Sequence, residues 1–69
     1  MKLSARNILK GKVKSITHGA VDSEVVLELS PGVEIVSIIT KSSAESLGLK
    51  VGDNACAIIK APNVIIGVE

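Results

Sequence analysis

The only arginine of this 69-residue sequence, Arg6, stands in a segment that contains no acidic side chain. Ser4 and Asn7 flank it with small polar groups that can donate hydrogen bonds, and no Asp or Glu precedes Asp22. An isolated surface arginine usually has no specific role. This one, however, precedes the first expected strand, so its segment can reach a neighbouring copy of the chain. A guanidinium among neutral donors is suited to binding an anion.

Two further groups of donors occur later in the chain. Lys60 follows an apolar run, and Ala61 supplies a backbone N–H. Thr40, Ser42 and Ser43 surround the expected start of a short helix, where free N–H groups and the helix dipole favour an anion. A divalent cation would require carboxylates or imidazoles, which both groups lack. The residue types therefore predict an oxyanion site, of unspecified ligand, and no site for a metal cation.

Residues suited to catalysis are scarce. His18, the only histidine, falls in an expected turn, and Cys56, the only cysteine, alternates with apolar residues in an expected strand. A buried thiol of that kind is more often part of the packing than a nucleophile. Glu24 and Glu28 are expected to pair with lysines, which leaves no carboxylate pair for acid–base chemistry. We therefore expect no enzymatic activity and no cofactor.

The composition also argues against several classes of partner. Eight basic and seven acidic residues give a net charge of +1, and Phe, Trp and Tyr are all absent. Single-stranded nucleic acid is bound by aromatic platforms in a basic groove, so no nucleic-acid partner is expected. The sequence contains no apolar run long enough to span a bilayer and no secretory signal, which predicts a cytoplasmic protein without a membrane partner.

The size of the chain predicts a single domain, residues 1–69, that associates with copies of itself. A chain this short buries only about 60% of its unfolded surface, so its core alone is marginal. One cysteine allows no intrachain disulfide, and one histidine with one cysteine cannot form a structural zinc site. Hydrophobic residues nevertheless make up 46% of the sequence. We therefore expect a second apolar face to be buried in a homo-oligomer.

Alternating residues predict a first hairpin with strands at 9–16 and 23–30. Its turn would lie around His18 and Gly19, with Gly19 at positive φ. Opposite charges on one face and apolar residues on the other favour one register. The expected pairs are Lys14 with Glu24, Lys10 with Glu28, Val13 with Val25 and Leu9 with Leu29.

The remaining chain predicts a helix between further strands. A turn at Pro31–Gly32 leads to a strand at 34–40, which is β-branched on both faces and so is expected to be buried on both. The helix would begin after Ser42 or Ser43, with Glu45 completing a capping box, and end at Gly48. The last two strands are expected at 54–60 and 63–69. The order predicts an all-β fold, an OB-like five-stranded barrel with one short helix between strands 3 and 4.

Three segments resemble the molbindin family of molybdate- and tungstate-binding proteins: "SARN", "SIITKSSAESLGL" and "AIIKAPNVIIGV". The resemblance covers essentially the whole chain and implies an OB-like fold, a hexamer built as a trimer of dimers, and oxyanion sites between subunits. The site residues that it implies are Ser4, Ala5, Arg6, Thr40, Ser43, Lys60 and Ala61. It also implies a second oxyanion site on a threefold axis, near His18, Gly19 and Ala20. Many family members carry a hydroxyl side chain near Ala61, and this chain does not, so Ala61 would contribute its backbone alone.

The implied ligand, molybdate or tungstate, fits a pocket made of donors. Molybdate is a tetrahedral dianion that accepts hydrogen bonds and donates none, whereas phosphate near neutral pH carries a proton that such a pocket would leave unpaired. The expected function is intracellular storage and homeostasis of the oxyanion. The alternative is an oligomeric OB-like interaction module without physiological anion binding.

Overall fold

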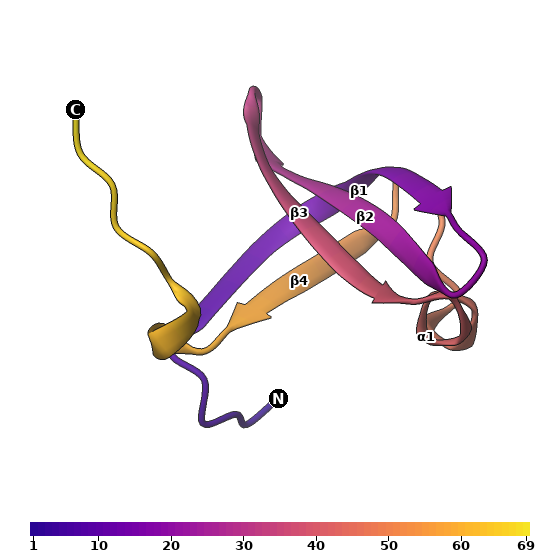
Figure 1. Cartoon of the computed structure of the whole chain (residues 1–69), viewed down its shortest axis with the longest axis horizontal. Coiled ribbons are helices and arrows are strands. Elements are labelled where there is room, and N and C mark those ends of the chain that lie inside the picture. The colour runs from indigo at the N-terminus through magenta and orange to yellow at the C-terminus, as the bar shows by residue number, and fades with distance from the viewer.

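The structure, a computed structural model, describes all 69 residues as a curled antiparallel sheet with one short helix (Figure 1). The sheet has four strands in the order β3-β2-β1-β4. The elements are β1 (Asn7–His18), β2 (Asp22–Ser30), β3 (Val33–Thr40), α1 (Lys41–Leu47), β4 (Asn54–Ile59) and the 3-10 turn η1 (Ala61–Asn63). A mostly β chain with one short helix between strands 3 and 4 is consistent with the expected OB-like class.

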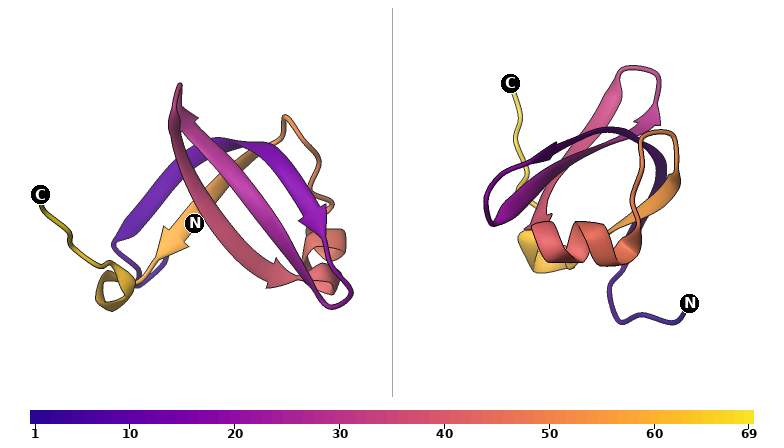
Figure 2. Two further views of the ribbon diagram at one scale, coloured as in Figure 1. Left: turned by 45° about the horizontal axis from the view of Figure 1, so that its top comes forward. Right: turned by 90° about the vertical axis from the view of Figure 1, so that its right-hand side faces the viewer.

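The core lies on the concave side of the sheet and is small. Val13, Val25 and Leu27 form its buried cluster, and Ala44 is the residue that α1 buries. Only five of the 69 residues are buried, which is too few for a core that must stabilise the chain alone. In the right-hand view of Figure 2 the strands curl around this core and α1 lies across one end of the curl.

The predicted register of the first hairpin is wrong. Lys12, not Lys10, lies opposite Glu28, and Thr17, not Lys14, lies opposite Glu24. The apolar pairs are shifted too: the structure pairs Val13 with Leu27 and Ile16 with Val25. The turn explains the shift, because it is centred between Ala20 and Val21 and not on Gly19, and a 2.7 Å bond from Gly19 N–H to the carbonyl of Asp22 closes it. Gly19 does not adopt the expected positive φ.

A β-bulge at Lys14 then moves the register back by one residue. The β1–β2 register changes between Val13 and Ser15, so one residue of β1 has no partner on β2. The bulge lets both Val13 and Ile16 pack on the core, which a regular strand would not allow because side chains alternate. The Lys14 side chain forms an ion pair with Glu34 at the start of β3 instead of the expected pair with Glu24.

The boundaries of α1 confirm one expectation and correct another. Gly48 ends the helix in the left-handed region at φ 64°, as expected. The N-cap is Thr40, not Ser42 or Ser43, and its hydroxyl oxygen accepts a 3.1 Å bond from the N–H of Ser43. The predicted capping box with Glu45 is therefore not formed. The single helix has seven residues, and no helix of the structure is long and apolar enough to cross a membrane.

The fifth predicted strand, at 63–69, is not formed in the single chain. The segment after β4 makes the turn η1, and residues Val64–Glu69 then leave the body of the protein without regular structure (Figures 1 and 2). The expected burial of both faces of β3 is also not seen, since Val36 and Ile38 are about three-fifths exposed. The five-stranded barrel is thus replaced by four strands that leave the space between β3 and β4 open.

Candidate oxyanion-binding site

The antiparallel ladder of β1 and β4 brings the first segment of the chain against the end of β4. The pairing runs from Lys12 with Asn54 to Asn7 with Ile59. The Asn7 side chain strengthens the last pair, because its Nδ2 donates a 3.2 Å hydrogen bond to the carbonyl of Ile59. Arg6 and Lys60 each lie one residue beyond this last pair.

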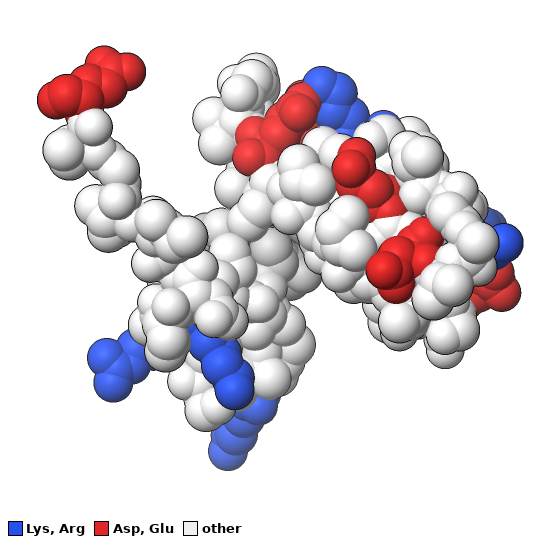
Figure 3. All heavy atoms as spheres, in the orientation of Figure 1, with Lys and Arg blue, Asp and Glu red and all other residues white.

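A cleft of about 290 Å³ lies at this end of the sheet. Its lining residues are Ser4, Ala5, Arg6, Lys60, Ala61 and Pro62. The lining contains two cationic side chains and no carboxylate. Neither cation has an ion-pair partner, since the one salt bridge of the chain joins Lys14 to Glu34. Figure 3 shows basic atoms without acidic neighbours at this end of the molecule, while basic and acidic atoms lie side by side at the other end.

The turn η1 holds the Lys60 side of the cleft in place. Lys60 precedes the turn in an extended conformation, and Pro62 stands in its first turn, where its missing N–H costs nothing. The N–H of Asn63 donates to the carbonyl of Lys60 at 2.9 Å, and the N–H of Val64 donates to the carbonyl of Ala61 at 3.2 Å. Five of the sequence-predicted residues, 4–6 and 60–61, thus line one cleft, and their role in binding stays a prediction.

Thr40 and Ser43 lie at the other end of the sheet, next to α1, and so are not in this cleft (Figure 1). Their hydroxyls form a small network in which Thr40 Oγ1 donates to Ser43 Oγ at 2.7 Å and lies 3.3 Å from Ser42 Oγ. Two backbone donors expected to be free are engaged. Ser43 N–H is bound by the Thr40 hydroxyl, and Lys41 N–H donates to the carbonyl of Val21 at 2.7 Å. The groups that remain available to a ligand at this end of the sheet are therefore mainly hydroxyl groups.

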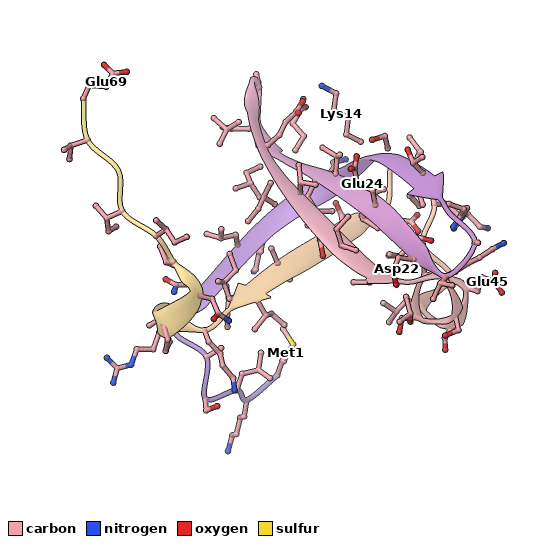
Figure 4. All side chains as sticks on the ribbon, in the orientation of Figure 1. Met1, Lys14, Asp22, Glu24, Glu45 and Glu69 are labelled. Atoms are coloured by element: carbon pink, nitrogen blue, oxygen red, sulfur yellow. The ribbon has the colours of Figure 1, made fainter.

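The predicted threefold-axis residues His18, Gly19 and Ala20 lie at the same end as Thr40. The β2–β3 ladder places Asp22, just after this turn, opposite Thr40. The Asp22 carboxylate therefore lies at this end of the molecule, near α1, as Figure 4 shows. His18 Nδ1 lies 2.6 Å from the hydroxyl oxygen of Ser23, which is buried. This turn is thus more acidic and more internally bonded than the cleft at the other end.

Two residues that hold these groups were not singled out from the sequence. Asn7 was expected only to flank Arg6, yet its side chain ties the start of β1 to the end of β4. Ser23 is 1% exposed and hydrogen-bonded to His18, although its place in an alternating strand suggested nothing beyond packing. The position of Asn7, directly after Arg6 and before the apolar strand, was the one available signal for its role.

Comparisons with known proteins agree with the fold. The TOBE domain matches residues 3–66. The chain is 48% identical over 66 residues to "Molybdenum-pterin-binding protein 3" of Clostridium pasteurianum, which covers 96% of this chain and 97% of that protein. A molybdate-binding protein from Sporomusa ovata has a similar structure, with a TM-score of 0.91 at 37% identity, covering 99% of this chain and 100% of that one.

A structure of the cytoplasmic molybdate-binding protein ModG with molybdate bound is also similar. Its TM-score is 0.94 at 56% identity, and the match covers 100% of this chain and 49% of the ModG chain. The family match and the full-length identity lead to the same assignment. This chain belongs to the TOBE-domain family and, within it, to the single-domain molybdenum-pterin-binding proteins, the molbindins.

Proposed function

We propose that the chain binds molybdate, and the nearly isosteric tungstate, at sites formed between subunits of a homo-oligomer. The observation that carries this proposal is the cleft that Arg6 and Lys60 both line, with no carboxylate in the lining. Two cationic side chains in one cleft, without an acidic partner, favour an anion there. Relatives named for molybdenum-pterin or molybdate binding match nearly the whole chain, which supports molybdate as that anion.

The two groups of donors lie at opposite ends of one chain, which supports a site shared between chains. The cleft at Arg6 and Lys60 is open on one side and supplies charge. The hydroxyls of Thr40 and Ser43 supply neutral donors from the far end of the sheet. A second copy turned end to end would bring its Thr40 and Ser43 against the first copy's cleft. We propose that pairs joined in this way assemble into a hexamer, a trimer of dimers, with a second oxyanion site near His18, Gly19 and Ala20 at the threefold axis.

The chemistry of the cleft explains the expected selectivity. The two side-chain charges of Arg6 and Lys60 balance one dianion. Hydroxyl and amide donors pair with every oxygen of molybdate, whereas a protonated phosphate would place its own donor against theirs. Sulfate is also a pure acceptor, so the site must reject it by size, through a rigid cavity shaped for a larger tetrahedron.

The proposed role is storage and homeostasis of the oxyanion in the cytoplasm, without catalysis, a cofactor, nucleic acid or a membrane. No group of three or more His, Cys, Asp or Glu side chains gathers in the structure. An oxyanion is bound by hydrogen-bond donors and cations, so it does not require such a group of metal-ligating side chains. The alternative is an oligomeric interaction module in which the cleft has lost its ligand.

Isothermal titration separates the two. The protein is titrated with molybdate, tungstate, sulfate and phosphate under identical conditions. Molybdate binding requires strong heats for molybdate and tungstate, and weak heats for the other two. Equal weak heats for all four anions would favour the interaction module.

A further inference from the structure

The two walls of the cleft are held in place in different ways. The turn η1 stiffens one wall, because the N–H of Asn63 donates to the carbonyl of Lys60 at 2.9 Å. On the other wall, residues 4–6 precede the sheet and take part in no hydrogen bond and no ion pair. The position of Arg6 therefore depends on the residue that follows it, where the chain enters β1.

That residue, Asn7, ties the Arg6 wall to the Lys60 wall. Its side chain is half-buried, and Nδ2 donates a 3.2 Å hydrogen bond to the carbonyl of Ile59, directly before Lys60. The bond joins two positions 52 residues apart in the sequence. Both partners are the residues next to the cations, so the bond fixes the two walls at the point where they leave the β1–β4 ladder.

Asn7 is not itself a candidate ligand of the anion. It does not line the cleft, and its amide nitrogen is occupied by the carbonyl of Ile59. Any effect of Asn7 on binding must therefore pass through Arg6. A guanidinium on a long side chain loses rotamer freedom when it contacts a ligand, and a fixed backbone lowers the remaining cost of ordering it.

We propose that Asn7 is a positioning residue that fixes Arg6 relative to Lys60 and so sets the size of the anion that the cleft accepts. The inference rests on the proposed function, in which sulfate is rejected by size and the cavity must be rigid. With the bond in place, the Arg6 wall does not close onto a smaller tetrahedron, and a larger oxyanion contacts both cations. Without the bond, the Arg6 wall moves toward Lys60 and adapts to sulfate.

Titration calorimetry with molybdate and sulfate tests this role. Asn7→Leu removes the donor at nearly constant size, and the ratio of the sulfate Kd to the molybdate Kd should fall about two- to tenfold, as expected for one hydrogen bond. Asn54→Leu is the matched control, because Asn54 is exposed, has no side-chain hydrogen bond and lies at the other end of the same ladder. An unchanged ratio in Asn7→Leu, or an equal fall in Asn54→Leu, would overturn the inference.

Two further variants separate positioning from a general loosening of the fold. In the Arg6→Ala background, Asn7→Leu should change the ratio no further, because Asn7 acts through Arg6. Asn7→Gln keeps an amide donor and should recover at least part of the ratio. A further fall of the same size in the Arg6→Ala background would mean that the effect does not pass through Arg6, and would contradict the positioning role.

NMR relaxation of the ligand-free protein tests the positioning without an anion. In Asn7→Leu the order parameter of the Arg6 backbone N–H should fall from the rigid range, about 0.85, toward values below about 0.6, while that of Lys60 should not change. Equal order parameters for Arg6 in wild type and Asn7→Leu would overturn the inference alone. A wild type that binds no oxyanion would reject the proposed function, and a loss of order at Arg6 would still show that Asn7 positions it.

Discussion

Arg6 and Lys60 each lie one residue beyond Asn7 and Ile59, the last pair of the β1–β4 ladder. They line one cleft and neither has an acidic partner. The ladder and the Asn7 side chain hold together the two chain segments that carry them. A cleft with two cations and no acid is suited to an anion, which is the ligand of the proposed function.

Arg6→Ala should weaken molybdate binding by about 2 kcal/mol or more, since a charge-assisted hydrogen bond to the oxyanion is lost. Titration calorimetry at fixed ionic strength measures the change. Lys2→Ala is the matched control, because it removes an exposed charge from the same segment but does not line the cleft. Equal affinities for Arg6→Ala and wild type would exclude Arg6 from the site.

Thr40→Val should lower both the stability of the protein and its affinity for molybdate. The Thr40 hydroxyl caps α1 through Ser43 N–H, and loss of such a cap costs about 0.5–2 kcal/mol. In the proposed shared site the same hydroxyl network also faces the partner's cleft. Thr40→Ser keeps the hydroxyl and should behave like wild type in thermal unfolding and in titration. Reduced stability with unchanged affinity in Thr40→Val would leave Thr40 as a cap alone.

The sequence predicted the elements better than it predicted their alignment. Periodicity located four strands, and turn and capping residues placed the turn at Pro31–Gly32 and the end of the helix at Gly48. The hairpin register failed because the turn is centred at Ala20 and Val21 and not at Gly19, and a bulge at Lys14 changes the register again along β1. A signal for the bulge was present, since Val13 and Ile16 are both core candidates and cannot share one face of a regular strand.

The candidate site was predicted only in part, because the sequence does not show which distant residues the strand pairing brings together. Arg6 and Lys60 are far apart in sequence, and only strand pairing shows that they are neighbours. The place of Thr40 depends on the length of the sheet, which sets it at the end opposite the cleft. The fifth strand failed because periodicity indicates that a segment suits a sheet, whereas the turn η1 directs residues 64–69 away from the sheet of their own chain.

The ion pair of Lys14 and Glu34 should stabilise the folded protein, and this contribution to the free energy of unfolding should be lost at alkaline pH. The hydrogen bond to Glu34 and its charge raise the pKa of Lys14 above the ordinary value of 10.5, with a smaller contribution from Glu28. A raised pKa in the folded state means that the stabilisation is complete below pH 10.5 and is lost as the pH rises through the folded-state value. The effect should be small and weakened by salt, because both side chains are exposed to solvent.

Denaturant unfolding as a function of pH measures this contribution. Lys14→Met should lose less stability than wild type as the pH rises above 10.5. Lys10→Met serves as the control, since Lys10 lies on the same strand and has no ion-pair partner. Parallel curves for wild type and Lys14→Met would mean that the ion pair does not persist in solution.

Gly11→Ala should destabilise the protein although it adds a single methyl group. Gly11 lies on β1 where β2 approaches closely, and a Cβ there would stand 2.7 Å from the carbonyl oxygen of Glu28 and 3.0 Å from the Leu29 side chain. The first contact is with backbone that the β2–β3 ladder holds, so β1 must shift away from β2. Overpacking of this kind costs about 1–3 kcal/mol. Lys12→Ala changes an exposed side chain on the same strand and should cost much less in urea unfolding, whereas equal costs for the two variants would show that β1 moves freely against β2.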